Sequence, residues 1–564
     1  MKVFSGFIAV RYRALYTLLL LGLGVLLDAQ IQKEELAVLT DRGHYITGET
    51  IRYRAFYRPP DAELAGEWSR VLYVELIQPN GTTLVLGKVR IDTLGAAGSL
   101  VIPEGLSSGT YYLKAYTRWM RNCGPEGYAY TSLRIYDPFN EEVLPVDSAD
   151  WESKAAWQMM GRGEVDAADV LECSLAKEQF GTREEVSLNL KWNMDRVPAD
   201  LTVSVSRKGL HGNQSYYRNG CEAASGDKEE ILPEMQGLSL TGQVVKSGGS
   251  PAPYATVYVS VLGEEKDFFC NYSDSAGRFY FSLPDYKGKR ELFVSAYHPD
   301  FPGVELLIDR DFSQDRLNLP SYPVQPDDSL NEIITDMSVN AQVAAQYYPT
   351  REPVQESRAP EELLFYGHPA FTIKFDDFIK LPNLAEYFLE VVPQVSVKRS
   401  QGIRRLVVLG EHPDLSIYSP LLMIDGVAIF DVEAVLAVSP RLIDRLEIIN
   451  APYIRGNVTF GGIISLISKN NDLGYIDLPS SGLLVDYQML DLPRSDPEMQ
   501  GIRDQRMPDV RNILYWNPEL ILSPRTDQHI SFRTSDLKGE YEILIRGTGA
   551  DGRYFEKRIP FRVD

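Results

Sequence analysis

Apolar and polar residues alternate over short runs along most of the chain, and turns containing Gly or Asn separate these runs. TIRYRAFY (50–57) alternates, VLYVELIQPNG (71–81) ends in an Asn-Gly turn, and LVIPEGLSSGTYYLKAYTRWM (100–120) holds a Ser-Ser-Gly turn between two runs. Alternation with a period of two predicts strands that turn one face to a core, and short strands joined by tight turns predict β-sandwiches. The 564 residues are enough for several such domains.

Further alternating stretches set the other expected β domains. FGTREEVSLNLKWN (180–193) repeats the Gly turn and the alternation of the first region, so we expect a second, divergent sandwich over residues 138–232. The strands around the tight DSAGRF turn predict a third sandwich over residues 236–311. Alternating runs near the C-terminus predict a linker and a terminal β-sandwich segment over residues 471–564.

Residues 312–360 change character. They begin Pro-rich, which indicates a linker. A helix is then expected, because Ile333, Met337, Ala341 and Ala344 fall on one face at helical spacing.

Residues 361–470 mix helical and strand patterns and predict a small α+β domain. Pro382 and Asn383 can start one helix, Asp431 can cap a second, short helix, and Ser439-Pro440 is a further cap-and-start pair. Asp425 and Gly426 separate two apolar runs in PLLMIDGVAIFD, which is typical of a two-residue hairpin. The predicted fold class is therefore mainly β and multidomain: tandem β-sandwiches, then a small α+β domain, then a terminal β-sandwich segment.

The N-terminus has the pattern of a secretory signal peptide. Lys2, Arg11 and Arg13 precede the apolar run LYTLLLLGLGVLL, and DAQ offers a cleavage site after Ala29. The run is short for a membrane span, so we expect residues 1–29 to be removed on export, with an uncleaved anchor as the alternative. The net charge of −21 argues against nucleic acid as a partner, because binding it needs clustered positive charge.

Two of the β regions resemble known domains. Residues 30–137 resemble the macroglobulin-like sandwich of alpha-macroglobulins, in the version found in exported proteins of Bacteroidetes; YITGETIRYRAFY, VLYVELIQPNG and SGTYYLKAYTRWMRN carry the resemblance. Residues 236–311 resemble the carboxypeptidase-regulatory-like sandwich through LTGQVVKSGGSPAPYATVYVSVLG and YSDSAGRFYFSLP. That domain is non-catalytic and often precedes plug domains. The resemblance implies tandem Ig-like or macroglobulin-like sandwiches.

Residues 361–470 resemble the plug of TonB-dependent outer-membrane receptors. MIDGVAI, IDRLEIINA and GGIISLISK match the most recognisable pieces of that plug, whereas APYIRGNVTF replaces the usual Gly-rich segment between its last two strands. About 95 residues follow, fewer than a barrel of about 22 strands with about ten residues each needs. We therefore expect a plug-like domain without a barrel on the same chain. The last segment resembles the terminal sandwich segment of related Bacteroidetes proteins.

The sequence offers no motif for catalysis or cofactor binding. CGPEG (123–127) lacks the Gln that forms the thioester of alpha-macroglobulins, so Cys123 is expected to be a packed loop residue. The six His form no close pair, and no GxSxG motif or phosphate loop occurs. We expect no enzyme activity, no metal site and no cofactor. Cys123, Cys173, Cys221 and Cys270 allow three disulfide pairings, but free buried thiols are the favoured prediction.

The expected function is that of a non-enzymatic exported adaptor or scaffold of the outer membrane, on its periplasmic face or at the cell surface. It would bind a β-barrel transport, assembly or secretion complex, and would associate with the membrane through that partner. The candidate interaction residues are Asp425 and Gly426 in the plug-like hairpin, and Tyr116 and Trp119 in the first sandwich, because Tyr and Trp are favoured at interfaces. Packing in the sandwich core is the alternative for the aromatic residues. A surface adhesin or glycan-binding protein is one competing hypothesis, and a hydrolase or protease inhibitor with an unrecognised site is another.

Overall fold

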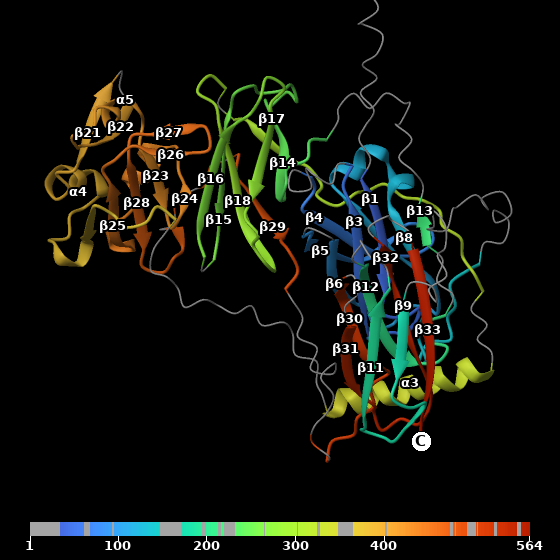
Figure 1. Ribbon diagram of the computed structural model, residues 1–564. Coiled ribbons are helices and arrows are strands. Elements are labelled where there is room, and N and C mark those ends of the chain that lie inside the picture. Colours follow the sequence, from blue (N-terminus) through green and yellow to red (C-terminus); the bar gives the residue numbers. More distant parts are fainter. Residues whose placement is uncertain are drawn as a thin grey trace, which may run out of the picture.

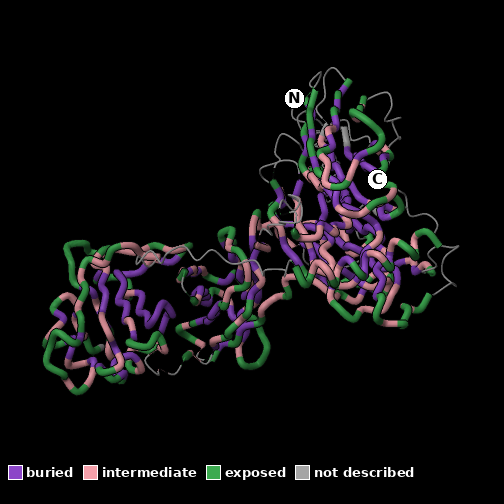
Figure 2. The backbone as a smooth tube through the Cα atoms, turned by 90° about the horizontal axis from the view of Figure 1, so that it is seen from below, coloured by how far each residue is buried: buried purple, intermediate pink, exposed green. Residues whose placement is uncertain are grey.

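The computed structural model of the chain contains three β-sandwiches and one α+β domain (Figure 1). The predicted fold class, mainly β and multidomain, is confirmed. The structure describes residues 34–60, 68–92, 95–146, 171–193, 199–212, 216–218, 232–263, 265–301, 303–323, 328–347, 365–400, 403–473, 476, 478–479, 481–492, 504, 506–523, 527–549 and 554–564. The predicted signal peptide lies outside these residues. Figure 2 shows two arms, each with buried residues along its interior.

The N-terminal sandwich, built mainly from residues 35–136, packs a sheet of order β1-β3-β6 against a sheet of order β13-β8-β7-β4-β5, and β2 pairs with β8. Its elements are β1 (Glu35–Thr40), β2 (His44–Ile46), β3 (Thr50–Arg58), β4 (Val71–Ile77), β5 (Thr83–Arg90), β6 (Gly95–Val101), β7 (Gly109–Thr117), η2 (Trp119–Cys123), η3 (Pro125–Gly127), β8 (Ala129–Tyr136) and β13 (Tyr216–Arg218). β13 was expected in the second sandwich, but it extends this sheet by pairing with β8.

Strand β7 is buried along its whole length, although the alternation in its sequence would also fit a strand that buries only one face. The reason is a second covering layer formed by residues 311–322. The backbone N–H of Ser313 donates to the Tyr116 hydroxyl (2.8 Å), and the Thr110 hydroxyl donates to the Tyr322 carbonyl (3.1 Å). The start of the predicted linker is therefore part of the packed structure.

The composite sandwich joins two segments that the sequence assigned to separate domains. One sheet has the order β10-β33-β32-β12-β30 and the other β31-β11-β9. The strands are β9 (Leu171–Leu175), β10 (Gln179–Phe180), β11 (Glu185–Trp192), β12 (Ala199–Arg207), β30 (Ile513–Leu522), β31 (Asp527–Arg533), β32 (Gly539–Gly549) and β33 (Tyr554–Val563). Figure 1 shows the red C-terminal strands beside the green ones.

Pairing explains why strands 171–207 of the predicted second sandwich and strands 513–563 of the predicted terminal segment form one domain. β12 lies between β30 and β32 and is antiparallel to both, and β11 pairs with β31. The buried core mixes side chains from both segments, among them Trp192, Val203 and Ile545. β9, β11 and β12 alone would leave their apolar faces without a partner sheet, so the C-terminal strands complete the domain.

The middle sandwich, residues 238–308 with one later strand, has sheets of order β17-β14-β19 and β16-β15-β18-β29. Its strands are β14 (Leu238–Val245), β15 (Thr256–Val261), β16 (Asp267–Tyr272), β17 (Arg278–Leu283), β18 (Lys289–Tyr297), β19 (Glu305–Ile308) and β29 (Leu483–Gln488). β29 comes from the region predicted as a terminal linker, and it forms the edge of the second sheet by pairing with β18.

The α+β domain, residues 365–473, is built on a sheet of order β20-β25-β28-β23-β24, with separate hairpins β21-β22 and β26-β27. Its elements are β20 (Phe371–Lys374), η4 (Phe375–Asp377), α4 (Leu384–Glu390), β21 (Val395–Ser400), β22 (Ile403–Val408), α5 (Asp414–Ile417), β23 (Leu421–Ile424), β24 (Val427–Ala428), α6 (Val432–Ala437), η5 (Pro440–Leu442), β25 (Ile443–Ile449), β26 (Tyr453–Arg455), β27 (Val458–Phe460) and β28 (Ile463–Ser468). The predicted helix start at Asn383 and the predicted cap at Asp431 are confirmed: the side chain of Asn383 accepts from the backbone of α4, and that of Asp431 from the backbone of α6. Ser439 precedes η5, which begins with Pro440 as predicted, but its side chain makes no cap hydrogen bond.

The predicted helix in residues 312–360 is confirmed as α3 (Asp328–Tyr347). Its buried residues include Ile334 and Met337. They pack against Ile46 and Tyr136 of the N-terminal sandwich and against Leu210, which follows β12 of the composite sandwich. α3 therefore lies against the junction between two sandwiches. No helix among the described residues is long and apolar enough to cross a membrane.

Candidate functional site

The Asp425-Gly426 turn joins β23 to β24 and is buried in the α+β domain. Asp425 (φ 52°) and Gly426 (φ 89°) both have left-handed backbone geometry, as a two-residue type I′ hairpin requires. The Asp425 carboxylate accepts hydrogen bonds from the backbone N–H and hydroxyl of Ser468 (2.8 and 2.6 Å) and from the backbone N–H of Leu473 (2.8 Å). A Cβ on Gly426 would lie 3.2 Å from Cδ of Lys266. The turn therefore ties β23 to the end of β28 and is covered by the middle sandwich.

Tyr116 lies in the interior of the N-terminal sandwich and is 0% exposed. Its hydroxyl donates to Glu75 (2.7 Å), and its ring stacks on Tyr128 with ring centroids 4.5 Å apart. Lys114 forms an ion pair with the same Glu75 at 3.0 Å. Burial raises the pKa of the Tyr116 hydroxyl well above its ordinary value, and the neighbouring Glu75 adds to the rise. Tyr116 is a core residue, which was the stated alternative to an interface residue.

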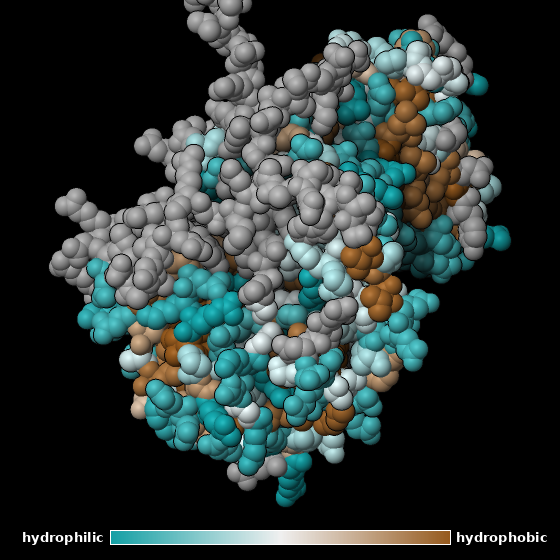
Figure 3. Space-filling view, turned by 90° about the vertical axis from the view of Figure 1, so that its right-hand side faces the viewer, coloured by the Kyte–Doolittle hydropathy of each residue, from teal (hydrophilic) through white to brown (hydrophobic). Residues whose placement is uncertain are grey.

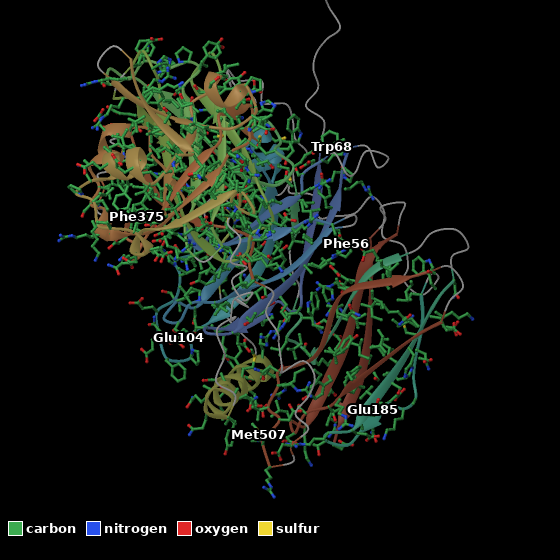
Figure 4. All side chains as sticks on the ribbon, turned by 90° about the vertical axis from the view of Figure 1, so that its left-hand side faces the viewer. Phe56, Trp68, Glu104, Glu185, Phe375 and Met507 are labelled. Carbon is green, nitrogen blue, oxygen red and sulfur yellow. The ribbon has the colours of Figure 1, made fainter. Side chains whose placement is uncertain are left out.

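Trp119 is half-buried at the start of η2. Its ring meets that of Trp68 edge-on, with centroids 6.5 Å apart. Figure 4 labels Trp68 near one end of the N-terminal sandwich, far from Phe375 in the α+β domain. Of the four predicted interaction residues, Trp119 alone keeps a partly exposed side chain, and the structure does not bring the two pairs together.

The α+β domain exposes apolar side chains that the sequence analysis did not single out. Ile379 is 86% exposed and Leu389 is 68% exposed. Phe378 and Ile379 precede α4 and Leu389 lies on it, while the Tyr387 hydroxyl donates to the Ile379 carbonyl (3.2 Å) and holds this loop on the helix. Figure 1 shows α4 at the end of the arm farthest from the N-terminal and composite sandwiches. We call Phe378, Ile379 and Leu389 the end cluster.

The end cluster could have been suspected from one signal. Phe378 and Ile379 lie outside the periodic spacing of the predicted helix and strands, so none of the predicted elements would bury them. Figure 3 shows the side of the molecule opposite α4, where the described side chains are mostly hydrophilic and apolar ones gather in separate groups, with a band at the upper right. Exposed apolar side chains that gather in one region of a surface are typical of contact surfaces.

A shared apolar core fixes the α+β domain to the middle sandwich. The core combines Tyr258, Phe268 and Cys270 of the middle sandwich with Leu421, Met423, Ala428, Val458, Phe460 and Ile463 of the α+β domain. The guanidinium of Arg455 donates to the Phe268 carbonyl (2.7 Å) and pairs with Asp267 (2.8 Å). The Asn457 side-chain oxygen accepts from the backbone N–H of Tyr272 (3.1 Å). Residues of hairpin β26-β27 therefore occupy the outer edge of β16.

A buried charged group lies at the junction of the N-terminal and middle sandwiches. The Lys88 ammonium is 0% exposed and forms an ion pair with Asp311. Its nitrogen lies 4.4 Å from the ring centroid of Tyr487, and the Tyr73 hydroxyl donates to Asp311 (2.9 Å). Burial lowers the pKa of Lys88, while Asp311 opposes the shift. The apolar core around it also runs without interruption through both sandwiches.

The junction of the N-terminal and composite sandwiches is polar as well. The buried Arg54 guanidinium pairs with Asp200 (3.2 Å) and Glu519 (2.6 Å), which lie on strands of the composite sandwich. The Ser204 hydroxyl donates to the Asp41 carbonyl (2.5 Å). Three junctions thus connect all four domains through buried contacts. Such contacts hold domains at set angles, because separating them would leave charges and polar groups unpaired.

The structure revises the predictions about cysteine. Cys123 is disulfide-bonded, so the expectation of a free thiol is wrong for it. Cys173 and Cys270 are free, as expected, and Cys221 lies outside the described residues. Burial raises the pKa of Cys173 to about 11 and that of Cys270 to about 12. Thiolates are therefore scarce at neutral pH, which argues against either thiol as a nucleophile. Within the described ranges, no group of three or more His, Cys, Asp or Glu is arranged to hold a metal ion.

Comparisons with known proteins give structural neighbours only. No family model matches the chain, and no curated protein matches it. Trypsin-activated alpha-2-macroglobulin from Escherichia coli matches 94% of this chain and 41% of its own, with 10% identity and a TM-score of 0.23. Salmonella alpha-2-macroglobulin reacted with methylamine matches 94% and 39%, with 9% identity and a TM-score of 0.23. Dimeric latent PorU from Porphyromonas gingivalis matches 49% and 33%, with 9% identity and a TM-score of 0.15.

The chain therefore spans about two fifths of the length of the alpha-2-macroglobulins that it matches. At these TM-scores, the similarity carries no argument about function or about the arrangement of the domains.

Proposed function

We propose that this protein is an exported, non-enzymatic scaffold that docks its α+β domain onto an outer-membrane β-barrel protein. The observation that carries the proposal is the end cluster. Phe378, Ile379 and Leu389 expose apolar surface on and beside α4, at the free end of an arm. Burying such side chains against a partner is favourable by roughly 25 cal/mol per Å² of apolar surface. A barrel partner is proposed because this domain resembles the plug of TonB-dependent receptors.

The rigid connection of the domains supports a scaffold role. The α+β domain shares a core with the middle sandwich, and the middle sandwich shares a core with the N-terminal one. The Arg54 ion pairs then join the N-terminal sandwich to the composite sandwich. A partner bound at the end cluster would thus be held at a defined distance from anything bound to the composite sandwich.

Two observations support export. The first 29 residues have the order of basic, apolar and cleavage regions that a signal peptide has. Cys123 is disulfide-bonded, and disulfides persist mainly in oxidising compartments such as the periplasm and the cell surface. The proposed location is the outer membrane, on either its periplasmic face or the cell surface, with attachment through the barrel partner.

The test is co-purification from outer membranes in mild detergent with point variants. Deleting the α+β domain would expose Phe268 and Cys270 of the middle sandwich, so a loss of binding would have two explanations. The double variant Ile379→Asp with Leu389→Asp places charge on side chains that are already exposed, and it leaves the core intact. Ile521→Asp is the matched control, since Ile521 is an exposed apolar residue (54%) of the composite sandwich.

A stoichiometric β-barrel protein that co-purifies with the wild type and the Ile521→Asp control, but at least tenfold less with the double variant, supports the proposal. Absence of any barrel protein from the wild-type preparation overturns it. Equal recovery with the double variant overturns the role of the end cluster and moves the contact to another surface. Thermal unfolding of each variant shows whether the fold is preserved.

A further inference from the structure

A pocket of about 510 Å³ opens on the surface of the middle sandwich, away from the end cluster. Three tyrosines line it, together with two asparagines, a serine, one acidic residue and one basic residue. Its walls come from the loop before β15, from β16 and β17, and from Asn457 in hairpin β26-β27 of the α+β domain. The pocket therefore lies where two domains meet, which is a common place for ligand sites.

Tyr254 is held in an unfavourable backbone conformation at the rim of this pocket. Its φ is 59°, a left-handed geometry that a bulky side chain rarely adopts and that Gly adopts freely. The backbone N–H of Tyr254 donates to the Asp274 carbonyl (3.3 Å), and Ala255 is hydrogen-bonded to Ser273 through its backbone N–H (2.9 Å) and carbonyl (2.8 Å). The ring gains little from burial, because Tyr254 is 65% exposed. Strain that no packing offsets points to a role in binding.

Several polar groups around the rings have hydrogen-bonding capacity left. The side-chain oxygens of Asn271 and Asn457 both accept from the backbone N–H of Tyr272 (3.0 and 3.1 Å), which turns the two amide groups toward the same strand end. Among the described residues, neither side-chain NH₂ group of this pair donates a hydrogen bond. Asp274 accepts the backbone N–H groups of Ala276 and Arg278 on one oxygen, at 2.8 Å each, and no described group donates to its other oxygen.

The surroundings argue against other classes of ligand. β16 is an edge strand, but Arg455 and Asn457 already bond to its backbone, so a peptide cannot add a strand along the stretch between Phe268 and Tyr272. The pocket contains one carboxylate and one guanidinium, and the guanidinium of Arg278 pairs with Asp309 (3.1 Å). The near balance of charge offers no attraction for a phosphate or another polyanion.

We propose that this pocket binds a neutral carbohydrate. The flat rings of Tyr254 and Tyr272, the latter 43% exposed, present apolar faces on which the C–H face of a sugar ring can lie. The amide donors of Asn271 and Asn457 and the carboxylate acceptor of Asp274 suit hydroxyl groups, each of which both donates and accepts. The site is independent of the end cluster, so its test does not depend on the proposed function.

Native affinity electrophoresis of the full mature chain tests the assignment. The protein is run through gels that contain soluble starch, mixed-linkage β-glucan, xylan, galactomannan or dextran, and its mobility is compared with that in a plain gel. Tyr254→Gly is the informative variant, because Gly removes the ring and also suits a φ of 59°. Tyr272→Ala removes the second ring. Tyr418→Ala is the control, since Tyr418 is equally exposed (43%) but lies in the α+β domain outside the pocket.

The expected result is retardation of the wild type and of Tyr418→Ala in at least one polysaccharide gel. The apparent dissociation constant should rise at least tenfold in Tyr254→Gly and in Tyr272→Ala, with the melting temperature of Tyr254→Gly no lower than that of the wild type. Unchanged mobility of the wild type in every gel overturns the assignment, and so does equal retardation of Tyr254→Gly. The assignment is also overturned, in favour of a peptide ligand, if the chain captures another protein through Tyr254 and is retarded in none of the gels.

Discussion

The Asp425 carboxylate binds both the backbone N–H and the hydroxyl of Ser468, at 2.8 and 2.6 Å, and so joins the β23-β24 turn to the end of β28. Asp425→Ala should weaken this end of the sheet by about 3 kcal/mol, because it leaves buried donors unsatisfied and places Ala at a left-handed φ. Amide hydrogen exchange of peptides that cover β28 measures the loss as faster exchange.

Asp431→Ala is the matched control for this prediction. Asp431 is an exposed carboxylate of the same domain, and it caps α6 through the backbone N–H groups of Glu433 and Ala434. Its loss should cost about 1 kcal/mol and affect α6 while leaving the exchange of β28 as it is. If the exchange of β28 is the same in Asp425→Ala as in the wild type, the three hydrogen bonds of Asp425 do not stabilise the sheet.

The buried ion pair between Lys114 and Glu75 allows a prediction about the stability of the protein. The pair lies in the core, where both side chains are nearly unexposed. Lys114→Met should destabilise the protein by about 3 kcal/mol, since it leaves the Glu75 carboxylate buried without the Lys114 ammonium that pairs with it. Chemical denaturation, followed by the fluorescence change of the N-terminal sandwich, measures the difference.

The exposed ion pair between Lys208 and Glu540 provides the comparison. Its separation is similar, at 2.8 Å against 3.0 Å, but both of its side chains face solvent. Lys208→Met should leave the unfolding midpoint unchanged, because solvent screens such pairs and mobile side chains lose entropy in forming them. A large loss in Lys208→Met, or none in Lys114→Met, would contradict burial as the deciding factor.

Turn chemistry could be predicted from the sequence because it depends on residues close together in the chain. The Asp425-Gly426 hairpin, the helix start at Asn383 and the cap at Asp431 formed where local rules placed them, whereas the side chain of Ser439 does not cap η5. Strand pairing over long distances could not be predicted. The alternation of β12 is the same whether its neighbours are adjacent in sequence or are β30 and β32 from the C-terminus, and Arg54 pairs with Glu519 across 465 residues.

The candidate site was less predictable than the fold for a related reason. The pattern around Tyr116 distinguishes two faces of a strand, but it does not show that a distant segment, residues 311–322, covers the outer one. The pocket at Tyr254 likewise depends on Asn457, which comes from another domain. Burial and site composition at domain junctions are set by tertiary packing, and local sequence carries little trace of it.

His211 should make stability depend on pH. Burial, with the nearby charge of Arg546 acting in the same direction, lowers its pKa to about 3, so the folded protein keeps the ring neutral. In the unfolded chain the pKa is about 6.5. Below about pH 6.5 the unfolded state takes up a proton that the folded state does not. The contribution of His211 to the free energy of unfolding therefore falls by about 1.4 kcal/mol per pH unit until the pH nears 3.

The variant His211→Gln removes the titrating ring and keeps a hydrogen-bonding group near Ser206. In the wild type, the Ser206 hydroxyl lies 3.1 Å from Nε2 of His211. Denaturant titrations of both proteins at pH 7, 6, 5 and 4 should show the wild type losing stability relative to the variant as the pH falls. A constant difference across this range would mean that the His211 ring is protonated, or reaches solvent, in the folded protein.

Cys270 reports whether the middle sandwich and the α+β domain stay together. Its side chain is buried between them, and its Sγ lies 3.1 Å from the Arg455 carbonyl. In a Cys173→Ser background, a thiol reagent at pH 7.5 should label Cys270 at least a hundredfold more slowly than in the unfolded chain, since burial blocks access and raises the pKa to about 12. Mass spectrometry of the labelled peptide gives the rate.

Removing the polar contact of the hairpin should speed this labelling. Arg455→Ala deletes the hydrogen bond to the Phe268 carbonyl and the ion pair with Asp267, which together are worth about 1.4 kcal/mol, a tenfold change in opening. Arg441→Ala, an exposed arginine of the same domain, is the control and should leave the rate unchanged. Fast labelling of Cys270 with Arg455 intact would show that hairpin β26-β27 leaves β16 in solution. In that case Asn457 would not be a fixed wall of the pocket, and the arm that carries the end cluster would not be rigid.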